Sequence, residues 1–258
     1  MDHAALLALF DAEVRRGARP DGPGARTERT AAVVRQTAPE RGWNGVLWSA
    51  LTERDADAVI AEQISRFTGL GRACEWKLYG HDRPADLGRR LVAAGFTPGP
   101  DETLMIGEIA ALNLDAAPPE GVDVVPVTDP AGVGLVAAVH ERVFGTDGSR
   151  LRHDLLARLA DGSGTVSAVL ALAGGEPVSA ARLELVPGTG FAGLWGGGTL
   201  PSWRGRGVYR ALVAHRARTA AEHGCRYLQV DASAESRPVL ERLGFAALTT
   251  TTPYDHLP

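Results

Sequence analysis

Several features that common protein classes require are scarce or missing in this sequence. Of the 27 basic residues only Lys77 is a lysine, and it stands in the strand-like segment CEWKLYG instead of beside glycines, where a Walker-type phosphate loop needs it. The two cysteines, Cys74 and Cys225, are too few for a disulfide framework and lack the spacing of metal ligands. The motifs H-E-x-x-H, C-x-x-C and G-x-S-x-G do not occur. We therefore expect no bound metal and no zinc protease, thiol redox or nucleophile-elbow chemistry.

Long apolar runs and strong charge are missing too. No stretch approaches about 18 uninterrupted apolar residues, so no membrane span is expected. The net charge is -4 and the longest basic runs are pairs, which argues against a nucleic-acid partner. Hydrophobic residues make up 45% and charged residues 22% of the chain, as is typical of a folded globular protein. The start of the chain has no signal-peptide pattern, and we expect a cytoplasmic location.

Two segments of the chain repeat the same order of features. The segments are CEWKLYGHDRPADLGRRLVAAGF at 74–96 and CRYLQVDASAESRPVLERLGF at 225–245. Each runs from a cysteine through an apolar strand and an Asp-containing turn to an Arg-Pro helix start, and each helix ends at Gly-Phe. Glycine suits the left-handed residue that ends many helices. Because a strand-like and a helix-like segment also precede both copies, the sequence predicts a duplicated α/β unit.

The duplication predicts two domains. The boundary is expected in the Pro- and Ala-rich segment NLDAAPPEGV, which separates a domain at 1–115 from a domain at 122–258. The fold class is α+β, with a mixed, mostly antiparallel sheet flanked by helices in each half. Residues 1–18 are expected to form an amphipathic helix on the first domain. In the second domain we expect strands at 122–127, 165–173, 176–186, 190–200, 226–231 and 245–251, and helices at 130–144, 150–160, 206–223 and 236–243.

A glycine-rich loop opens the longest helix expected in the second half. In TLPSWRGRGVYRALV, 199–213, Pro201 ends a strand and the segment RGRG at 204–207 precedes the helix. The first amides of a helix have no partner within it and lie at the positive end of its dipole, and glycines let a ligand approach them. A diphosphate is the natural ligand of such a loop. The loop alone leaves open a plain connection with two solvated arginines.

The order of elements around this loop, over about residues 122–252, resembles the GCN5-related N-acetyltransferase family. Arg204, Gly207 and Tyr209 stand at the three positions of the family motif R-x-x-G-x-[small], and Tyr209 departs from the usual Gly or Ala. The resemblance implies acetyl-CoA as co-substrate, with pyrophosphate on the loop amides and pantetheine along the end of the preceding strand. The cofactor-binding residues that it implies are Thr199, Leu200, Arg204, Gly205, Arg206, Gly207, Val208, Tyr209 and Ser236.

The catalytic groups that the resemblance implies are missing from their usual places. Many family members have a carboxylate on the central strand and a tyrosine on the Gly-Phe helix, but FAGLWGGGTL has no carboxylate and the tyrosine position holds Leu240. A base is needed because deprotonating an ammonium of pKa about 10.4 at pH 7 costs about 4.6 kcal/mol. The best remaining base is Glu184, which strand alternation places opposite Leu183 and Leu185. The alternative is an ordinary solvent-facing strand glutamate.

Three functions are compatible with these features. The leading one is an acetyl-CoA-dependent N-acetyltransferase that passes the acetyl group directly, in a ternary complex, to the amine of a small molecule. The second is a catalytically silent acyl-CoA-binding sensor or scaffold, and the third is a structural duplication without CoA, against which the intact loop argues. Residues 1–120 hold 14 basic and 18 acidic residues and the rest 13 of each, which mildly suits a cationic acceptor.

The remaining candidates are ambiguous in the sequence. The loop of the first half that corresponds to the glycine loop, ALTERDADAV at 50–59, has no glycine and four charged residues, so we expect no CoA there. Trp195 either lines the acceptor pocket or belongs to the core. The cluster Tyr254, Asp255 and His256 either reaches the site or forms a frayed tail.

Overall fold

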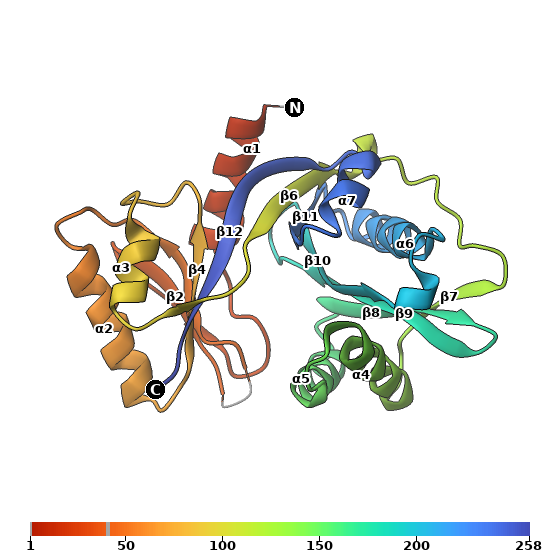
Figure 1. Ribbon diagram of the computed structural model, residues 1–258, viewed down its shortest axis with the longest axis horizontal. Helices are drawn as coiled ribbons and strands as arrows, with labels where there is room; N and C mark the ends of the chain where they lie inside the picture. The colour runs from red at the N-terminus through yellow and green to blue at the C-terminus, as the bar shows by residue number, and fades with distance from the viewer. Residues whose placement is uncertain (1, 40–41) are drawn as a thin grey trace. The chain divides into compact units, whose positions relative to one another are not determined.

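The computed structural model describes residues 2–39 and 42–258, which form two compact units (Figure 1). Unit 1 contains residues 1–104, 231–234 and 247–258, and unit 2 contains residues 105–230 and 235–246. Each unit combines a mixed, mostly antiparallel sheet with flanking helices, so the α+β class is confirmed. Across the described ranges, no helix is both long enough and apolar enough to cross a bilayer.

Unit 1 is built on a sheet in the order β1-β2-β3-β4-β12, in which β3 and β4 are parallel and the other pairs antiparallel. The helices α2 and α3 supply Ile60, Phe67 and Leu91 to a core that also contains Trp76 of β4. This core forms because the apolar residues of β4 alternate with polar ones and face the helices. The elements are α2 (Ala56–Gly69), α3 (Leu87–Ala93), β1 (Arg26–Arg29), β2 (Val33–Thr37), β3 (Gly45–Ser49), β4 (Cys74–Tyr79), β5 (Thr97–Pro98) and β12 (Ala246–His256).

The N-terminal helix packs on unit 1, as its amphipathic pattern predicts. The α-helix α1 (His3–Phe10) continues into a π-helical segment, Asp11–Arg16, while residue 1 lies outside the described residues. Arg15 is buried, donates a hydrogen bond of 3.1 Å to the carbonyl of Leu47 and pairs with Asp82 at 2.7 Å. These contacts tie the helix to β3 and to the loop after β4.

A partly buried charged cluster lies on the face of β4 opposite that core. Lys77 Nζ is 2.8 Å from Asp231 and 3.9 Å from Glu102. Burial is the largest single effect and lowers the pKa of Lys77, but the charges of Asp231, Tyr79 and Glu75 and the hydrogen bond to Asp231 together outweigh burial and raise this pKa. Burial raises the pKa values of Glu75 and Glu102. One ammonium thus compensates several carboxylates.

The substitution Lys77→Met is expected to destabilise the protein by about 3–5 kcal/mol near neutral pH, because it leaves Asp231 buried without a counter-charge. Glu75 and Glu102 have higher pKa values in the folded state than in the unfolded state, so protonation below their folded-state pKa favours folding. The stability deficit of the variant should therefore shrink at acid pH. Urea unfolding of both proteins at about pH 7.5 and about pH 5 checks this, and an equal deficit at both would contradict it.

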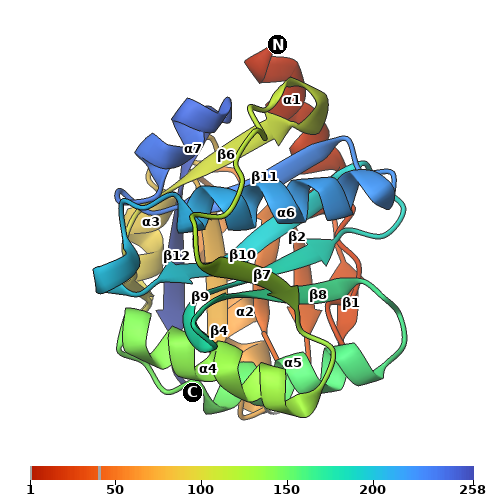
Figure 2. The ribbon, with the colours of Figure 1, turned by 90° about the vertical axis from the view of Figure 1, so that its right-hand side faces the viewer.

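Unit 2 has the strand order β6-β11-β10-β9-β8-β7, with residues 105–108 of β6. Helices α4 and α5 cover one face, where Val133 and Leu155 pack on β8, and α6 covers the other with Val208 and Leu212 (Figure 2). The expected strands and helices are present. Their bounds are α4 (Pro130–Phe144), α5 (Ser149–Ala160), α6 (Val208–Glu222), α7 (Arg237–Leu243), β6 (Glu102–Glu108), β7 (Val122–Pro126), β8 (Val166–Ala173), β9 (Glu176–Leu185), β10 (Phe191–Thr199) and β11 (Tyr227–Ala232).

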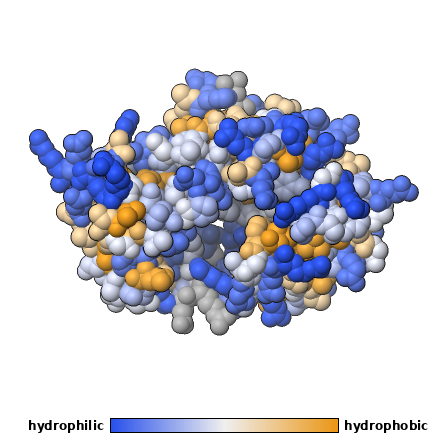
Figure 3. Space-filling model, in the orientation of Figure 1, coloured by the Kyte–Doolittle hydropathy of each residue, from blue (hydrophilic) through white to orange (hydrophobic). Residues whose placement is uncertain are grey.

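The surface seen in Figure 3 is mostly hydrophilic, with small apolar patches. The exposed large hydrophobic side chains are Leu70, Val92, Leu135, Phe144 and Leu257. Among the described residues they come from four segments of the chain, with Leu135 and Phe144 both in α4. Isolated apolar side chains of this kind are normal on a protein surface and do not by themselves indicate an interface.

The repeat seen in the sequence has the same local geometry in both copies. Gly95 and Gly244 both have φ of 99°, which glycine adopts without strain. The amide of Phe96 donates to the carbonyl of Leu91 at 3.0 Å, and that of Phe245 donates to Leu240 at 3.1 Å. Both helices thus end in the same left-handed turn.

The last strand differs from the sequence-based expectation. β12 runs to His256 and pairs with β4, with Tyr254 opposite Trp76, so the prediction of a frayed tail is wrong. Most of β12 belongs to unit 1, although it follows the second Gly-Phe, and residues 105–108, which follow the first, belong to unit 2. The two compact units are therefore not separated by one domain boundary near residues 113–122. Unit 1 includes most of β12 from the second half of the sequence, and unit 2 includes residues 105–108 of β6 from the first half.

Candidate active site

Two neighbouring strands of unit 2 separate part of the way along their length. β10 and β11 are parallel and pair from Phe191–Tyr227 to Gly193–Gln229, and no further pair follows although β10 continues to Thr199. The other edge of β10 stays paired with β9, with a bulge between Trp195 and Gly198. Within the described chain, residues 194–199 therefore have no strand partner on the β11 side. An extended ligand can add to such an edge through main-chain hydrogen bonds.

The glycine loop lies directly after this edge. Gly205 and Gly207 have φ of 74° and 88°, a conformation that favours glycine, and Gly207 precedes the first turn of α6. The first hydrogen bond of the helix is donated by Ala211 to the carbonyl of Gly207. The amides of residues 205–210 donate no hydrogen bond to any residue that the structure describes. Six amides at the positive end of a 15-residue helix are thus available as hydrogen-bond donors, an arrangement that favours an anion.

The arginines of the loop connect it to its surroundings. Arg204 Nε donates to the carbonyl of Thr199 at 3.2 Å, and its guanidinium lies 3.7 Å from Glu235. The guanidinium of Arg206 stacks on Trp203 at 4.8 Å. Both arginines are exposed and lie beside the amides, where they add positive charge. Ser236 starts α7, next to Glu235.

Tyr209, the departure from the family motif, leaves the loop free. A Cβ atom at Gly197 would lie 3.0 Å from its ring, which shows that the side chain packs against the strand bulge. Burial raises the pKa of its hydroxyl. Tyr209 thus offers the loop only its backbone, and the missing side chain of Gly197 makes room for the ring.

The structure brings the predicted residues 199–209 together at the end of β10 and the start of α6. The backbone groups of Leu200, however, already make hydrogen bonds within the protein. Its amide donates to the carbonyl of Val178 at 2.9 Å and its carbonyl accepts from the amide of Trp203 at 2.8 Å. The Thr199 hydroxyl is hydrogen-bonded to that of Ser179 at 2.8 Å. The open backbone edge therefore lies in the strand residues before Leu200.

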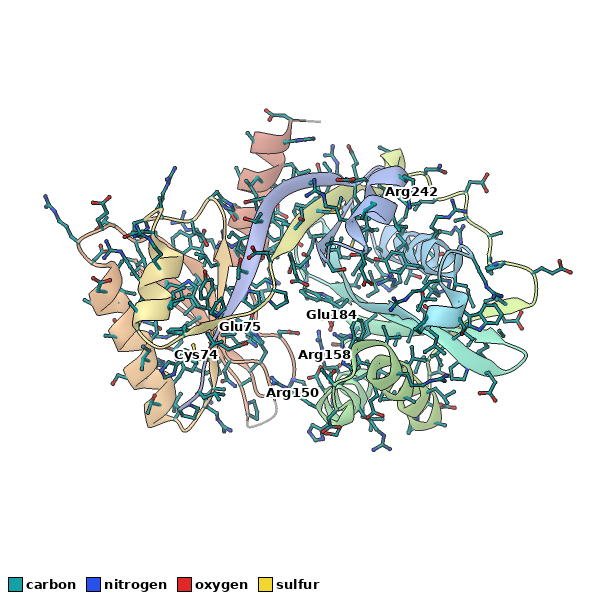
Figure 4. All side chains as sticks on the ribbon, viewed as in Figure 1. Cys74, Glu75, Arg150, Arg158, Glu184 and Arg242 are labelled. Carbon is teal, nitrogen blue, oxygen red and sulfur yellow. The ribbon has the colours of Figure 1, made fainter. Side chains whose placement is uncertain are left out.

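Glu184 is held by two arginines. Its carboxylate accepts a hydrogen bond of 2.9 Å from Arg158 of α5 and lies 3.5 Å from Nε of Arg182 (Figure 4). The side chain of Glu184 is 14% exposed and that of Arg158 is 9% exposed. Glu184 is therefore not an ordinary solvent-facing residue of the strand. It lies opposite Gly193, the last residue of β10 that pairs with β11.

Two further polar groups meet over Gly193. A side chain at Gly193 would begin 2.8 Å from Nε2 of Gln229, and Nε1 of Trp195 lies closer still. Gln229 is 5% exposed, and neither side chain makes a hydrogen bond within the described residues. Trp195 is thus not simply part of the core. Gln229 was missed in the sequence, where the only signal is one amide inside the apolar strand YLQVDA.

A buried arginine supports the same region from the α6 side. Arg216 donates from Nε to the carbonyl of Leu212 and from Nη1, at 3.0 Å, to the carbonyl of Arg182. Burial lowers the pKa of Arg216 to about 10. Its Nη2 has no hydrogen-bond partner among the described residues. The hydrogen bond from Arg216 fixes the backbone of Arg182. In the sequence Arg216 looks like an ordinary arginine of a helix.

These features and the comparison with known protein families point to a class of enzyme. Residues 136–245 match the model of the acetyltransferase (GNAT) family. The α+β sheet with its separating parallel strand pair, and the helix that starts on a glycine loop, are those of an acyltransferase.

Solved structures share the fold over almost the whole chain. A GCN5-related N-acetyltransferase from Kribbella flavida is 19% identical, with a TM-score of 0.70 and coverage of 99% of this chain and 94% of that chain. A tandem GNAT protein from the clavulanic acid biosynthesis pathway is 13% identical, with a TM-score of 0.64 and coverage of 98% and 93%. A functionally unknown protein from Staphylococcus epidermidis is 13% identical, with a TM-score of 0.67 and coverage of 93% and 96%. No curated protein matches the sequence significantly.

Proposed function

We propose that the second half of the chain transfers the acetyl group of acetyl-CoA to the amine of a small molecule. The observation that carries this proposal is the row of unpartnered amides at residues 205–210, directly after a strand with an open edge. The amides would bind the pyrophosphate, assisted by the charges of Arg204 and Arg206. The edge at 194–199 would pair with the pantetheine arm, which directs the thioester toward Gly193.

Direct transfer in a ternary complex fits the chemistry of the side chains. An acyl-enzyme would need an activated nucleophile, but burial raises the pKa of Cys225, which keeps its thiol protonated. In direct transfer, the amine nitrogen attacks the thioester carbonyl and CoA leaves as a thiolate. Glu184, or a water that it orients, would take the proton that the amine loses. The carboxylate lies in the row of residues Glu184, Gly193 and Gln229 that crosses the point where the strands separate.

The first half is proposed to bind no CoA. At the start of α2 the Asp55 carboxylate accepts the amide of Thr52 at 2.7 Å, and the amide of Ala56 donates to the carbonyl of Thr52 at 3.1 Å. The first amide of α2 is therefore engaged within the turn, whereas the first amide of α6, that of Val208, is not. The acidic side chains Glu53, Asp55 and Asp57 would also repel a diphosphate.

A silent acyl-CoA-binding protein is the second candidate, because Glu184 is already paired with arginines and Leu240 is buried at the usual tyrosine position. Acetyl-CoA and a panel of small amines distinguish the two functions. Amine-dependent release of CoA, measured as free thiol, supports transfer. Saturable binding of acetyl-CoA without amine-dependent release would overturn transfer and support the silent protein.

A further inference from the structure

The polar groups around Gly193 include an arginine whose side chain makes no hydrogen bond within the described residues. Arg182 of β9 lies opposite Trp195, and its side chain is 19% exposed. Its Nε is buried and has no hydrogen-bond partner, although it lies 3.5 Å from Glu184. A buried guanidinium N–H that donates no hydrogen bond is costly unless a ligand accepts it.

Glu184 does not neutralise Arg182 by itself. Its carboxylate already accepts a hydrogen bond from Arg158 at 2.9 Å, a shorter contact than the one with Arg182. Arg158 also lies 4.0 Å from the more exposed carboxylate of Asp154. The other titratable group that faces Arg182 is His140 of α4, whose pKa is lowered by burial and by the charge of Arg182. This imidazole is therefore neutral near pH 7 and adds no negative charge.

The neighbouring neutral groups are also donors without acceptors. The indole N–H of Trp195 and the amide of Gln229 both lie over Gly193, and the amide is nine-tenths buried. Together with Arg182 they present several N–H groups on one face of the sheet. Planar guanidinium and amide donors of this kind match the two oxygens of a carboxylate.

We propose that the acceptor is an amine that also carries a carboxylate, as amino acids do, and that Arg182, Trp195 and Gln229 bind this carboxylate. The inference rests on the proposed acetyl transfer, since it names the acceptor of that reaction. It differs from the cationic acceptor that the overall acidic balance suggests, because the local donors act at contact distance whereas distant surface charges are screened. In this arrangement the carboxylate holds the acceptor while its amine faces the thioester near Glu184.

The test compares amino acids with their primary amides, which keep the amine and remove the negative charge. With acetyl-CoA saturating, kcat/KM for the preferred amino acid should exceed that for its amide by about 10²-fold or more. Arg182→Gln should remove most of this preference, so the ratio of kcat/KM for the acid to kcat/KM for the amide should fall by a similar factor. Gln229→Leu, of similar volume, should lower it by about tenfold. The affinity for acetyl-CoA, measured by calorimetry, should stay unchanged in both variants.

Turnover of amides as good as that of acids, or equal losses for both in Arg182→Gln, would overturn the inference while leaving acetyl transfer intact. If no amine is acetylated, calorimetric binding of the same amino acids to the CoA-saturated protein decides. Binding to the wild type that Arg182→Gln abolishes supports the carboxylate site although transfer fails. If the amino acids do not bind to the wild type at about 10 mM, the proposed carboxylate site is overturned. At this concentration only a Kd far weaker than about 1 mM would escape detection.

Discussion

The substitution Gly207→Asp is expected to weaken the binding of acetyl-CoA by about 100-fold, which corresponds to about 2.7 kcal/mol. Gly207 immediately precedes α6 and has φ of 88°, a conformation that Asp and Asn tolerate better than most residues. The new carboxylate would lie beside the amides of residues 205–210 and repel the pyrophosphate. It would also interact favourably with the helix dipole, which offsets part of the cost of a side chain at this positive φ. Calorimetric titration gives the affinity, and thermal unfolding gives the stability.

The matched control is Gly207→Asn. Asn has nearly the same size and the same tolerance of a left-handed backbone, but it carries no charge. We expect it to weaken binding by less than about tenfold, so that the difference between the two variants reports the charge. Equal affinities of the two variants for acetyl-CoA would show that the pyrophosphate does not bind at these amides.

The substitution Glu184→Gln is expected to lower kcat by about 10²-fold or more while leaving the affinity for acetyl-CoA unchanged. Gln has the volume of Glu and its carbonyl still accepts a hydrogen bond from Arg158, so the packing of α5 on the sheet is retained. What it loses is the capacity to take a proton from the amine. Steady-state release of CoA, with the amine and acetyl-CoA varied separately, measures both parameters. An unchanged kcat would remove Glu184 from the mechanism.

The control for a structural role is Arg158→Gln. This variant keeps the carboxylate and removes the cation that contacts it at 2.9 Å. Because the proton acceptor is still present, kcat should fall much less in Arg158→Gln than in Glu184→Gln. If instead both variants lose activity equally, Glu184 acts as an anchor for the arginines.

Much of the second half could be predicted from its sequence, because its information is local. The strand alternation, the capping residues Asp129 and Gly244 and the glycines of the loop each specify their own surroundings. The order of elements around Gly207 then indicated the family. The same local reasoning located the glycine loop, whose function depends on the backbone more than on side-chain partners.

What could not be predicted depends on contacts between distant segments. The chain end forms β12 because β4, more than 170 residues earlier, offers it an open edge, and no local pattern encodes this partner. The pairing of Glu184 with Arg158 likewise joins a strand to a helix 26 residues away. Gln229 and Arg182 look ordinary in the sequence, and the unpartnered Nε of Arg182 and the position of Gln229 over Gly193 become visible only in three dimensions.

Calorimetric titration of the purified protein with acetyl-CoA tests the central claim most directly. The open amides at residues 205–210 in one half, and the engaged, acidic helix start in the other, predict saturable binding at one site per chain. Two sites per chain would contradict the assignment of the first half. No binding at ligand concentrations of about 1 mM, which corresponds to less than about 4 kcal/mol, would contradict the acetyl-CoA site itself.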